Sequence, residues 1–235
     1  MILHLIMSCN RPEFLMKSLA SVHKVNFEGM PVYRVLIDDY PHNRNSEMFT
    51  VLARTYAIDL LILNRENLGL SVVWGMLWDM FKSGNYTFVL HQEDDAVLKH
   101  PISIRSWIKT LEGACNSVLT RQKWYPREQE TAPRPTDAII DGMRVEYRRE
   151  VFSPMFSLYR AEIMRQFTGK LNEGTIMAAM KQPAAYVKTP DGSNMIEHVG
   201  HWKTGRIITE GEPGWDKFKH YDPAKKYCSI TGKQL

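Results

Sequence analysis

Short apolar runs alternate with longer amphipathic stretches along the first 100 residues. Four runs of strand length lie at 2–8, 32–37, 58–63 and 87–91. The stretches between them place apolar side chains at helical spacing, at 13–22, 43–57 and 71–81. This β-α-β-α-β-α-β pattern predicts an α/β fold with a mostly parallel sheet flanked by helices and joined by right-handed crossovers.

The second half of the chain is less regular. Helical spacing occurs at 107–119, 161–167 and 173–181, and a strand-like apolar run at 152–159. Residues 125–136 are rich in proline and charge, and Gly, Pro and charged residues dominate from 189 onward. We expect one domain over 1–235, with a regular half at 1–100 and an irregular half at 101–235.

Composition is that of a soluble globular protein, with 44% hydrophobic and 24% charged residues among 235. The net charge of +4 suits polyanionic ligands such as nucleoside diphosphates, but it is too small for a dedicated DNA-binding domain. The three cysteines form no CxxC pair, which favours a reduced setting. No basic leader precedes the apolar start, and no run approaches the roughly 20 residues of a membrane helix. We expect a cytoplasmic protein without a membrane span.

Polar residues follow each predicted strand of the first half. They lie at 8–11, 38–39, 64–67 and 93–95. Because ligands of open parallel sheets bind at the carboxyl ends of the strands, these residues are the candidates for a site.

Three consecutive carboxylates, Glu93, Asp94 and Asp95, form the strongest of these signals. Strand alternation would point Glu93 and Asp95 to one side and Asp94 to the other. Adjacent carboxylates repel one another and are tolerated in full solvent or beside a cation. A solvated turn is the plain interpretation, but the position at a sheet edge favours a Mg²⁺ or Mn²⁺ site with phosphate oxygens as further ligands.

Four segments together resemble the glycosyltransferases of the GT-A fold. They are Ser8-Cys9-Asn10-Arg11-Pro12, Asp38-Asp39, the Asn67-x-Gly69 turn and the DxD-like Glu93-Asp94-Asp95. In that family the first packs on the nucleotide, the second contacts the base or ribose, and the last holds a metal ion. One departure is Trp74-Gly75, where many family-two-like members carry an Arg-Asn pair.

The resemblance implies a nucleoside-diphosphate sugar donor, with a UDP-sugar favoured, and 1–100 as the nucleotide-binding half. It assigns the Mn²⁺ or Mg²⁺ ion to Asp95, with Glu93 acting through water or the ribose and Asp94 near the sugar or ribose. A C-terminal histidine often completes such a metal site, and His198 fits this role better than His201. An ordinary loop histidine is the alternative.

The acceptor-binding half would then be 101–235, and an inverting enzyme of this kind needs a general base. Glu173 opens a predicted helix after an apolar segment and is the first candidate, with Asp141 and Glu150 as alternatives. A glutamate at this position is also explained by the helix dipole alone.

The acceptor hydroxyl could belong to a saccharide or to a modified base in DNA, as for some phage enzymes of this fold. A sugar nucleotidyltransferase is an alternative, but its glycine-rich loop is missing, since residues 8–13 contain no glycine. A non-catalytic nucleotide- or DNA-binding protein is another, because residues 121–149 mix Arg and Lys with Trp124, Tyr125 and Tyr147. Acidic residues nearly balance the basic ones there.

Overall fold

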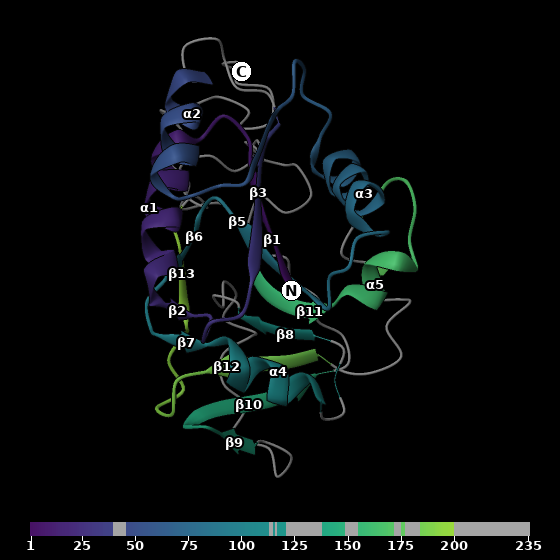
Figure 1. Cartoon of the computed structure of the whole chain (residues 1–235). Coiled ribbons are helices and arrows are strands. Elements are labelled where there is room, and N and C mark those ends of the chain that lie inside the picture. The colour runs from purple at the N-terminus through teal and green to yellow at the C-terminus, as the bar shows by residue number, and fades with distance from the viewer. Residues whose placement is uncertain are drawn as a thin grey trace, which may run out of the picture.

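A computed structural model describes residues 1–39, 46–112, 115, 117–120, 138–148, 155–171, 175–176 and 184–199. One large sheet runs through the molecule, and helices cover both faces of its first half (Figure 1). None of the helices in these residues combines the length and the apolar character that a membrane crossing needs.

The first half of the sheet is parallel and follows the predicted order of strands and helices. Its main elements are β1 (Ile2–Ser8), α1 (Pro12–Ser21), β3 (Val32–Asp38), α2 (Ser46–Thr55), β4 (Leu60–Leu63), α3 (Leu70–Phe81) and β5 (Phe88–Glu93). β1 pairs in parallel with both β3 and β5, and β3 pairs in parallel with β4. The order β4-β3-β1-β5 confirms the predicted α/β arrangement and places the first strand in its middle.

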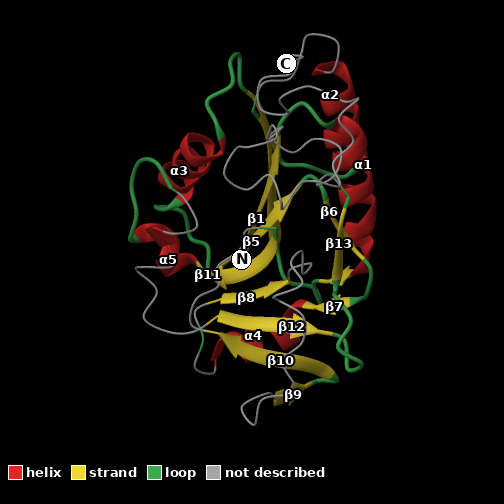
Figure 2. Ribbon diagram, turned by 180° about the vertical axis from the view of Figure 1, so that it is seen from behind, coloured by secondary structure: helices red, strands yellow, loops and turns green. Residues whose placement is uncertain are grey.

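The second half extends the same sheet with strands of mixed direction. In spatial order from β5 these are β11 (Phe156–Arg160), β8 (Ser117–Thr120), β12 (Ala184–Lys188), β10 (Met143–Arg148) and β9 (Ala138–Ile140). β8 and β12 are parallel, whereas the pairings of β11 with β5 and β8, and of β10 with β12 and β9, are antiparallel. Figure 2 shows these strands stacked beyond β5, at the end of the molecule away from α2.

Short elements complete the described part. They are η1 (Val22–Lys24), β2 (Val25–Asn26), β6 (Ala96–Leu98), β7 (Ile102–Ser103), α4 (Ile104–Glu112), α5 (Ala161–Arg165) and β13 (Ile196–His198). β6 pairs with β13, and β2 pairs with β7. The first of these pairs matters for the site, because β6 directly follows the acidic triplet.

The predicted helix over 107–119 is wrong in its last part. α4 ends at Glu112, and β8 begins at Ser117. Val118 and Leu119 are fully buried in a strand that pairs with β11 on one side and β12 on the other. Tertiary pairing has overridden the local helical spacing, as it often does for short β segments. The strands β9, β10 and β12 were not predicted, whereas β11 and α5 match the runs at 152–159 and 161–167.

The core explains why β1 reads as a continuous apolar run. α1 and α2 cover one face of the parallel sheet, and α3 and α5 cover the other (Figure 1). Leu3, Leu5 and Met7 pack in the cluster below α3, while Ile6 packs with α1 and α2. All seven residues of β1 are buried, as expected for a strand with both faces covered.

Trp74 and Gly75 of α3 serve packing. Trp74 is 1% exposed and meets Trp78 edge to face, with ring centroids 5.8 Å apart. Gly75 faces the backbone after α5, where a Cβ atom at position 75 would lie 1.7 Å from the carbonyl oxygen of Gly169. Only glycine allows this approach, so the departure from the Arg-Asn pattern has a structural cause.

The close approach at Gly75 yields a prediction that runs against helix propensity. Gly75→Ala should destabilise the protein by roughly 1–3 kcal/mol through overpacking, although Gly→Ala in an open helix stabilises by about 1 kcal/mol. Urea unfolding followed by circular dichroism measures the change. Met80→Ala, at a 48% exposed position of the same helix, is the control and should shift stability by about 0.5 kcal/mol or less. A Gly75→Ala protein as stable as the wild type would contradict the close contact.

Candidate active site

The carboxyl ends of β1, β3 and β5 bring the predicted polar segments together. Ser8 is the register partner of Asp38, and Met7 is the partner of Glu93. The backbone N–H of Asp39 donates to the carbonyl of Ser8 at 2.8 Å. Segments separated by tens of residues therefore meet at one edge of the sheet, as predicted from the strand order.

The Asp39 carboxylate organises the turn before α3. Its Oδ1 accepts hydrogen bonds from the side-chain amide of Asn64 at 2.9 Å and the backbone N–H of Leu68 at 3.0 Å. Its Oδ2 accepts from the backbone N–H of Gly69 at 2.8 Å. Gly69 has a φ of 81°, which favours glycine strongly, so the Asn67-x-Gly69 turn and Asp39 form one unit.

Asp38 is fully buried at the end of β3. Its Oδ2 accepts a hydrogen bond from the backbone N–H of Asn10 at 2.9 Å. Burial raises the pKa of Asp38 to about 7, and its hydrogen bonds to Ser8 and Asn10 oppose this shift. Among the described residues, Oδ1 has no hydrogen-bond partner. A buried carboxylate oxygen without a hydrogen bond adds to the reasons why the carboxyl favours its neutral form.

Asp94 points back toward the end of β1. Its Oδ2 accepts from the Ser8 hydroxyl at 2.9 Å, from the Cys9 backbone N–H at 3.4 Å and from Arg11 Nε at 2.9 Å. Arg11 Nη2 donates to Oδ1 of the same carboxylate. Burial raises the pKa of Asp94, and the Arg11 guanidinium opposes that shift. The side chain is wholly inaccessible, so Asp94 acts on the site by holding Ser8 and Arg11.

β5 ends at Glu93, and Asp95 lies in the turn that follows it. Asp95 Oδ2 accepts from Arg11 Nη1 at 2.8 Å, and its side chain is 5% exposed. The carbonyl of Asp95 accepts from the backbone N–H of Val199 at 2.8 Å, and His198 is the register partner of Ala96. The backbone thus brings the two predicted metal ligands, Asp95 and His198, side by side, although the side chain of His198 lies outside the described part.

A cavity of about 140 Å³ lies between these segments. Its walls are Met7, Ser8, Cys9, Arg11, Asp39, Asn67, Leu70, Val73 and Glu93. Five residues singled out in the sequence therefore line one space: Ser8, Arg11, Asp39, Asn67 and Glu93. A pocket of mixed apolar and convergent polar groups is the usual form of a small-molecule site.

Cys9 is a wall residue that motif reasoning left without a role. Its Sγ donates to the carbonyl of Asp39 at 3.2 Å and accepts from the Asn67 amide at 3.4 Å. The pKa of Cys9 is raised to about 12, mainly by burial and further by the negative charges of Asp38 and Asp39. The thiol therefore stays protonated and tethers the turn, and nucleophilic chemistry is not its role.

The candidates for a general base lie elsewhere. Asp141 is in the exposed turn between β9 and β10, where Lys109 pairs with it at 3.2 Å, and several strands separate it from β5. Glu173, Glu150 and His201 fall outside the described residues. The neighbours of Glu173, Leu171 and Ile176, are buried in the cluster below α3, and the N–H of Leu171 donates to the carbonyl of Ser71 at 2.9 Å.

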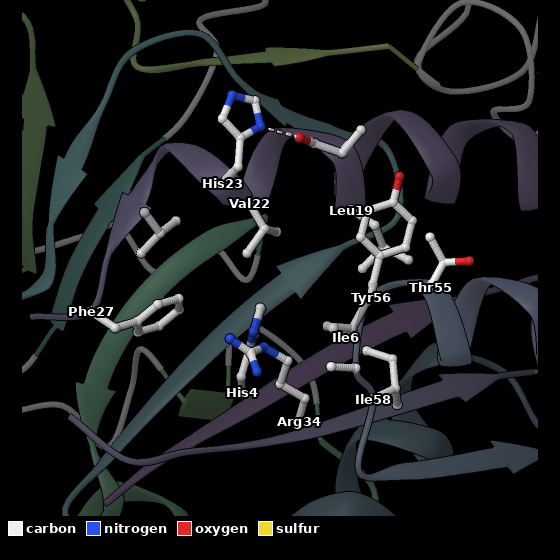
Figure 3. Close-up of a pocket in the computed structure, with 13 residues that line it drawn as sticks. His4, Ile6, Leu19, Val22, His23, Phe27, Arg34, Thr55, Tyr56 and Ile58 are labelled. Atoms are coloured by element: carbon white, nitrogen blue, oxygen red, sulfur yellow. Dashed lines mark hydrogen bonds between the residues drawn. The ribbon is translucent and has the colours of Figure 1, made fainter. Parts of the chain in front are cut away.

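A larger cavity of about 390 Å³ lies on the face of the sheet that α1 and α2 cover, and residues of β1, α1 and α2 line it (Figure 3). Its polar wall residues include His4 of β1 and its register partner Arg34 of β3. His4 Nε2 bonds to Gln92 Oε1 at 2.8 Å, and Gln92 Nε2 donates to the Ser18 hydroxyl at 2.6 Å. Ser18 in turn donates to the carbonyls of Ala96 at 2.6 Å and Glu93 at 3.1 Å. This buried chain fastens α1 to β5 directly behind the triplet.

The carboxylates at the sheet edge suit a divalent cation that takes most of its ligands from a bound substrate. Within the described residues, no three His, Cys, Asp or Glu side chains are grouped as a metal cage. Asp94 has both oxygens committed to Arg11 and its neighbours, whereas Glu93 lines the cavity and Asp95 follows Asp94 with its Oδ2 on Arg11. Mg²⁺ and Mn²⁺ accept one or two protein carboxylates when phosphate oxygens supply the rest.

Comparison with solved structures finds proteins that share this architecture. A mannosyltransferase, PcManGT from Pyrobaculum calidifontis in complex with GDP-Man and Mn²⁺, matches with a TM-score of 0.59 at 12% identity. The match covers 91% of this chain and 59% of that one. S. aureus TarS matches with a TM-score of 0.56 at 12% identity, over 83% of this chain and 36% of that one. TarS 1–349 in complex with UDP-GlcNAc matches with 0.56 at 13% identity, over 86% and 61%.

These similarities show the fold, which is GT-A-like. The chain spans less than two thirds of the length of each of these neighbours. No protein-family model and no curated protein sequence matches the chain.

The buried position of Asp38 predicts a particular pH dependence of stability. The pKa is about 7 when folded and 3.8 ordinarily, so the folded state holds the proton more tightly. Asp38 therefore removes stability as pH rises from about 4 to about 7, at about 1.4 kcal/mol per pKa unit. Asp38→Asn keeps an acceptor for the Asn10 N–H and does not titrate. Its free energy of unfolding should therefore rise relative to that of the wild type over this pH range. Urea unfolding at about pH 4 and about pH 8 would measure this difference, because these values lie at or beyond the two ends of the range. If the unfolding free energies of Asp38→Asn and the wild type differed by the same amount at both pH values, the argument from burial would be contradicted.

Proposed function

We propose that this protein is a glycosyltransferase that moves a sugar from a nucleoside-diphosphate sugar to an acceptor hydroxyl. One observation carries the proposal: four motif segments converge around one cavity at the carboxyl edge of a GT-A-like sheet. Ser8, Arg11, Asp39, Asn67 and Glu93 line that cavity. A UDP-sugar is the proposed donor, since a neighbour of this fold is described in complex with UDP-GlcNAc.

Each segment has a proposed task in donor binding. Asp38 would accept a hydrogen bond from the base or ribose, and the backbone N–H of Asn10 donates to its Oδ2. Asp39 holds the Asn67-x-Gly69 turn that forms one wall. Glu93 would reach the ribose directly or through water, and Asp94 would act from behind through Ser8 and Arg11.

Charge in the site suits a diphosphate held together with a cation. Arg11 lies at the beginning of α1, where the Phe14 N–H donates to its carbonyl at 3.1 Å. The first turn of a helix offers backbone donors and a positive dipole end to an anion. Asp95 and His198 would hold the Mn²⁺ or Mg²⁺ ion. When bound, the ion would act as a Lewis acid and neutralise the leaving diphosphate.

The acceptor side is proposed to use Glu173 as the general base of an inverting reaction. Leu171 and Ile176 anchor the chain on either side of it below α3, whose first turn borders the cavity. A carboxylate brought there would deprotonate the acceptor hydroxyl on the face of the sugar opposite the diphosphate. A saccharide hydroxyl is the first acceptor to test, and a hydroxylated base in DNA is the second.

Ligand-induced stabilisation tests the donor and the metal site. UDP with Mn²⁺ should raise the melting temperature of the wild type, since a ligand at 100 times its Kd stabilises by about 2.7 kcal/mol. Asp95→Asn should lose the Mn²⁺-dependent part, because it removes the proposed ligand. Asp59→Asn, at an exposed position before β4, should behave as wild type. Stabilisation by no nucleotide in a UDP, GDP, ADP and CDP panel would contradict the function, and a Mn²⁺ effect that persists in Asp95→Asn would contradict the metal site.

Kinetics of sugar transfer test the general base. Glu173→Gln should lower kcat by about 10²- to 10⁴-fold while the KM for the donor changes little, because proton removal from the acceptor is what is lost. Asp141→Asn is the matched comparison, since its turn is exposed and paired with Lys109. A product assay with UDP-hexoses and a panel of saccharide and DNA acceptors supplies the rates. If Asp141→Asn lost activity and Glu173→Gln kept it, the assignment of the base would be wrong.

A further inference from the structure

The Arg11 guanidinium binds two neighbouring carboxylates through separate edges. Nε at 2.9 Å and Nη2 grip Asp94, while Nη1 reaches Asp95 at 2.8 Å. Bidentate pairing of this kind is strong and directional. The guanidinium is therefore fixed by Asp94, and its remaining edge lies on Asp95.

The two contacts differ in how easily they can be exchanged. Asp94 is fully buried and also binds Ser8 and Cys9, so releasing Arg11 from it would leave an uncompensated buried charge. Asp95 accepts from Arg11 Nη1, and its side chain is 5% exposed while that of Arg11 is 21% exposed. The contact with Asp95 uses one N–H group of Arg11, whereas the contact with Asp94 uses two, so an exchange at Asp95 gives up fewer hydrogen bonds.

We propose that Arg11 is a tethered competitor of the divalent cation at Asp95. Cation binding would exchange the contact between Nη1 and Asp95 for a metal–carboxylate bond, while Nε and Nη2 stay on Asp94. The released Nη1 would then donate to a phosphate oxygen in the same cavity, which Arg11 already lines. This inference rests on the proposed function, since it takes the assignment of the metal to Asp95 from it.

Such an exchange couples the cation to the diphosphate. Without a diphosphate, the cation must displace a charged hydrogen bond and gains no replacement for it. With UDP present, the displaced donor finds a phosphate oxygen, so UDP should strengthen cation binding, and by linkage the cation should strengthen UDP binding equally. Arg11 would thereby disfavour a bare metal ion in an empty site.

A pair of variants isolates the competition. Asp94→Asn first removes the buried charge that Arg11 neutralises, and its amide oxygen can still accept from Ser8. Adding Arg11→Met to that background removes the guanidinium but keeps much of the apolar stem. The measured quantity is the Kd of Mn²⁺ alone, from the electron paramagnetic resonance signal of the free ion. The double variant should bind Mn²⁺ about tenfold more tightly than Asp94→Asn, the effect of freeing one charged hydrogen-bond acceptor.

The control removes a more exposed Arg–carboxylate pair away from the site. Arg105 Nε pairs with Glu28 at 2.7 Å, and adding Arg105→Met to Glu28→Gln should leave the Mn²⁺ Kd unchanged. A Kd that is equal in Asp94→Asn and the double variant, or weaker in the double variant, would overturn the competition. Absence of Mn²⁺ binding in all variants would overturn it too, while UDP binding and metal-free transfer would still support the proposed function.

A measurement on the wild type guards against misfolded variants. Side-chain NMR of ¹⁵N-arginine protein, titrated with Mg²⁺ and then with UDP, follows the Arg11 resonances directly. Shifts of the Arg11 Nη signals with Mg²⁺, and further shifts with UDP, would support the exchange. If the Asp95 backbone resonance shifted with Mg²⁺ and the Arg11 signals did not, the proposed exchange would be overturned.

Discussion

The buried pairing of Arg11 with Asp94 holds the site together. Asp94 follows β5, and Arg11 lies between β1 and α1, so this one interaction joins the ends of two adjacent strands to the start of a helix. Ser8 and the Cys9 N–H complete the shell around the same carboxylate. Removing one partner of such a buried pair typically costs about 3–5 kcal/mol. The shape of the cavity mouth depends on it, because Ser8, Cys9 and Arg11 all line that cavity.

Two further buried polar arrangements support this edge from different directions. Asp39 fixes the turn that leads into α3 by accepting from the N–H groups of Leu68 and Gly69. Behind the triplet, His4, Gln92 and Ser18 form a hydrogen-bonded chain that ends on the carbonyls of Glu93 and Ala96. Polar groups buried in a low dielectric are costly unless satisfied, so each arrangement favours one geometry over its alternatives. The ligand-facing groups are therefore held by side chains that do not themselves reach the ligand.

The sequence only partly predicts the separate roles of the three carboxylates in the acidic triplet. Glu93 lines the cavity, but β5 ends there, so Asp94 and Asp95 lie in the following turn and both accept from Arg11 instead of alternating. The sequence does not reveal that Asp94 is wholly buried and serves as an anchor, because its partners Ser8 and Arg11 are more than 80 residues away along the chain. The same limit applies to Trp74-Gly75. Its meaning became clear only when α3 was seen against the backbone of Gly169.

What the sequence by itself determined is the parallel half of the fold and the edge where its polar residues gather. Both follow from local rules: apolar runs covered on two faces read continuously, and parallel strands all end at the same edge. Tertiary structure alone decided the mixed half, where β8 replaced the end of a predicted helix and β12 and β10 came from segments without a clear period. It also decided which carboxylate binds the protein and which faces the cavity. Those outcomes depend on pairing and burial between distant segments, and the spacing of hydrophobic residues along the chain does not indicate them.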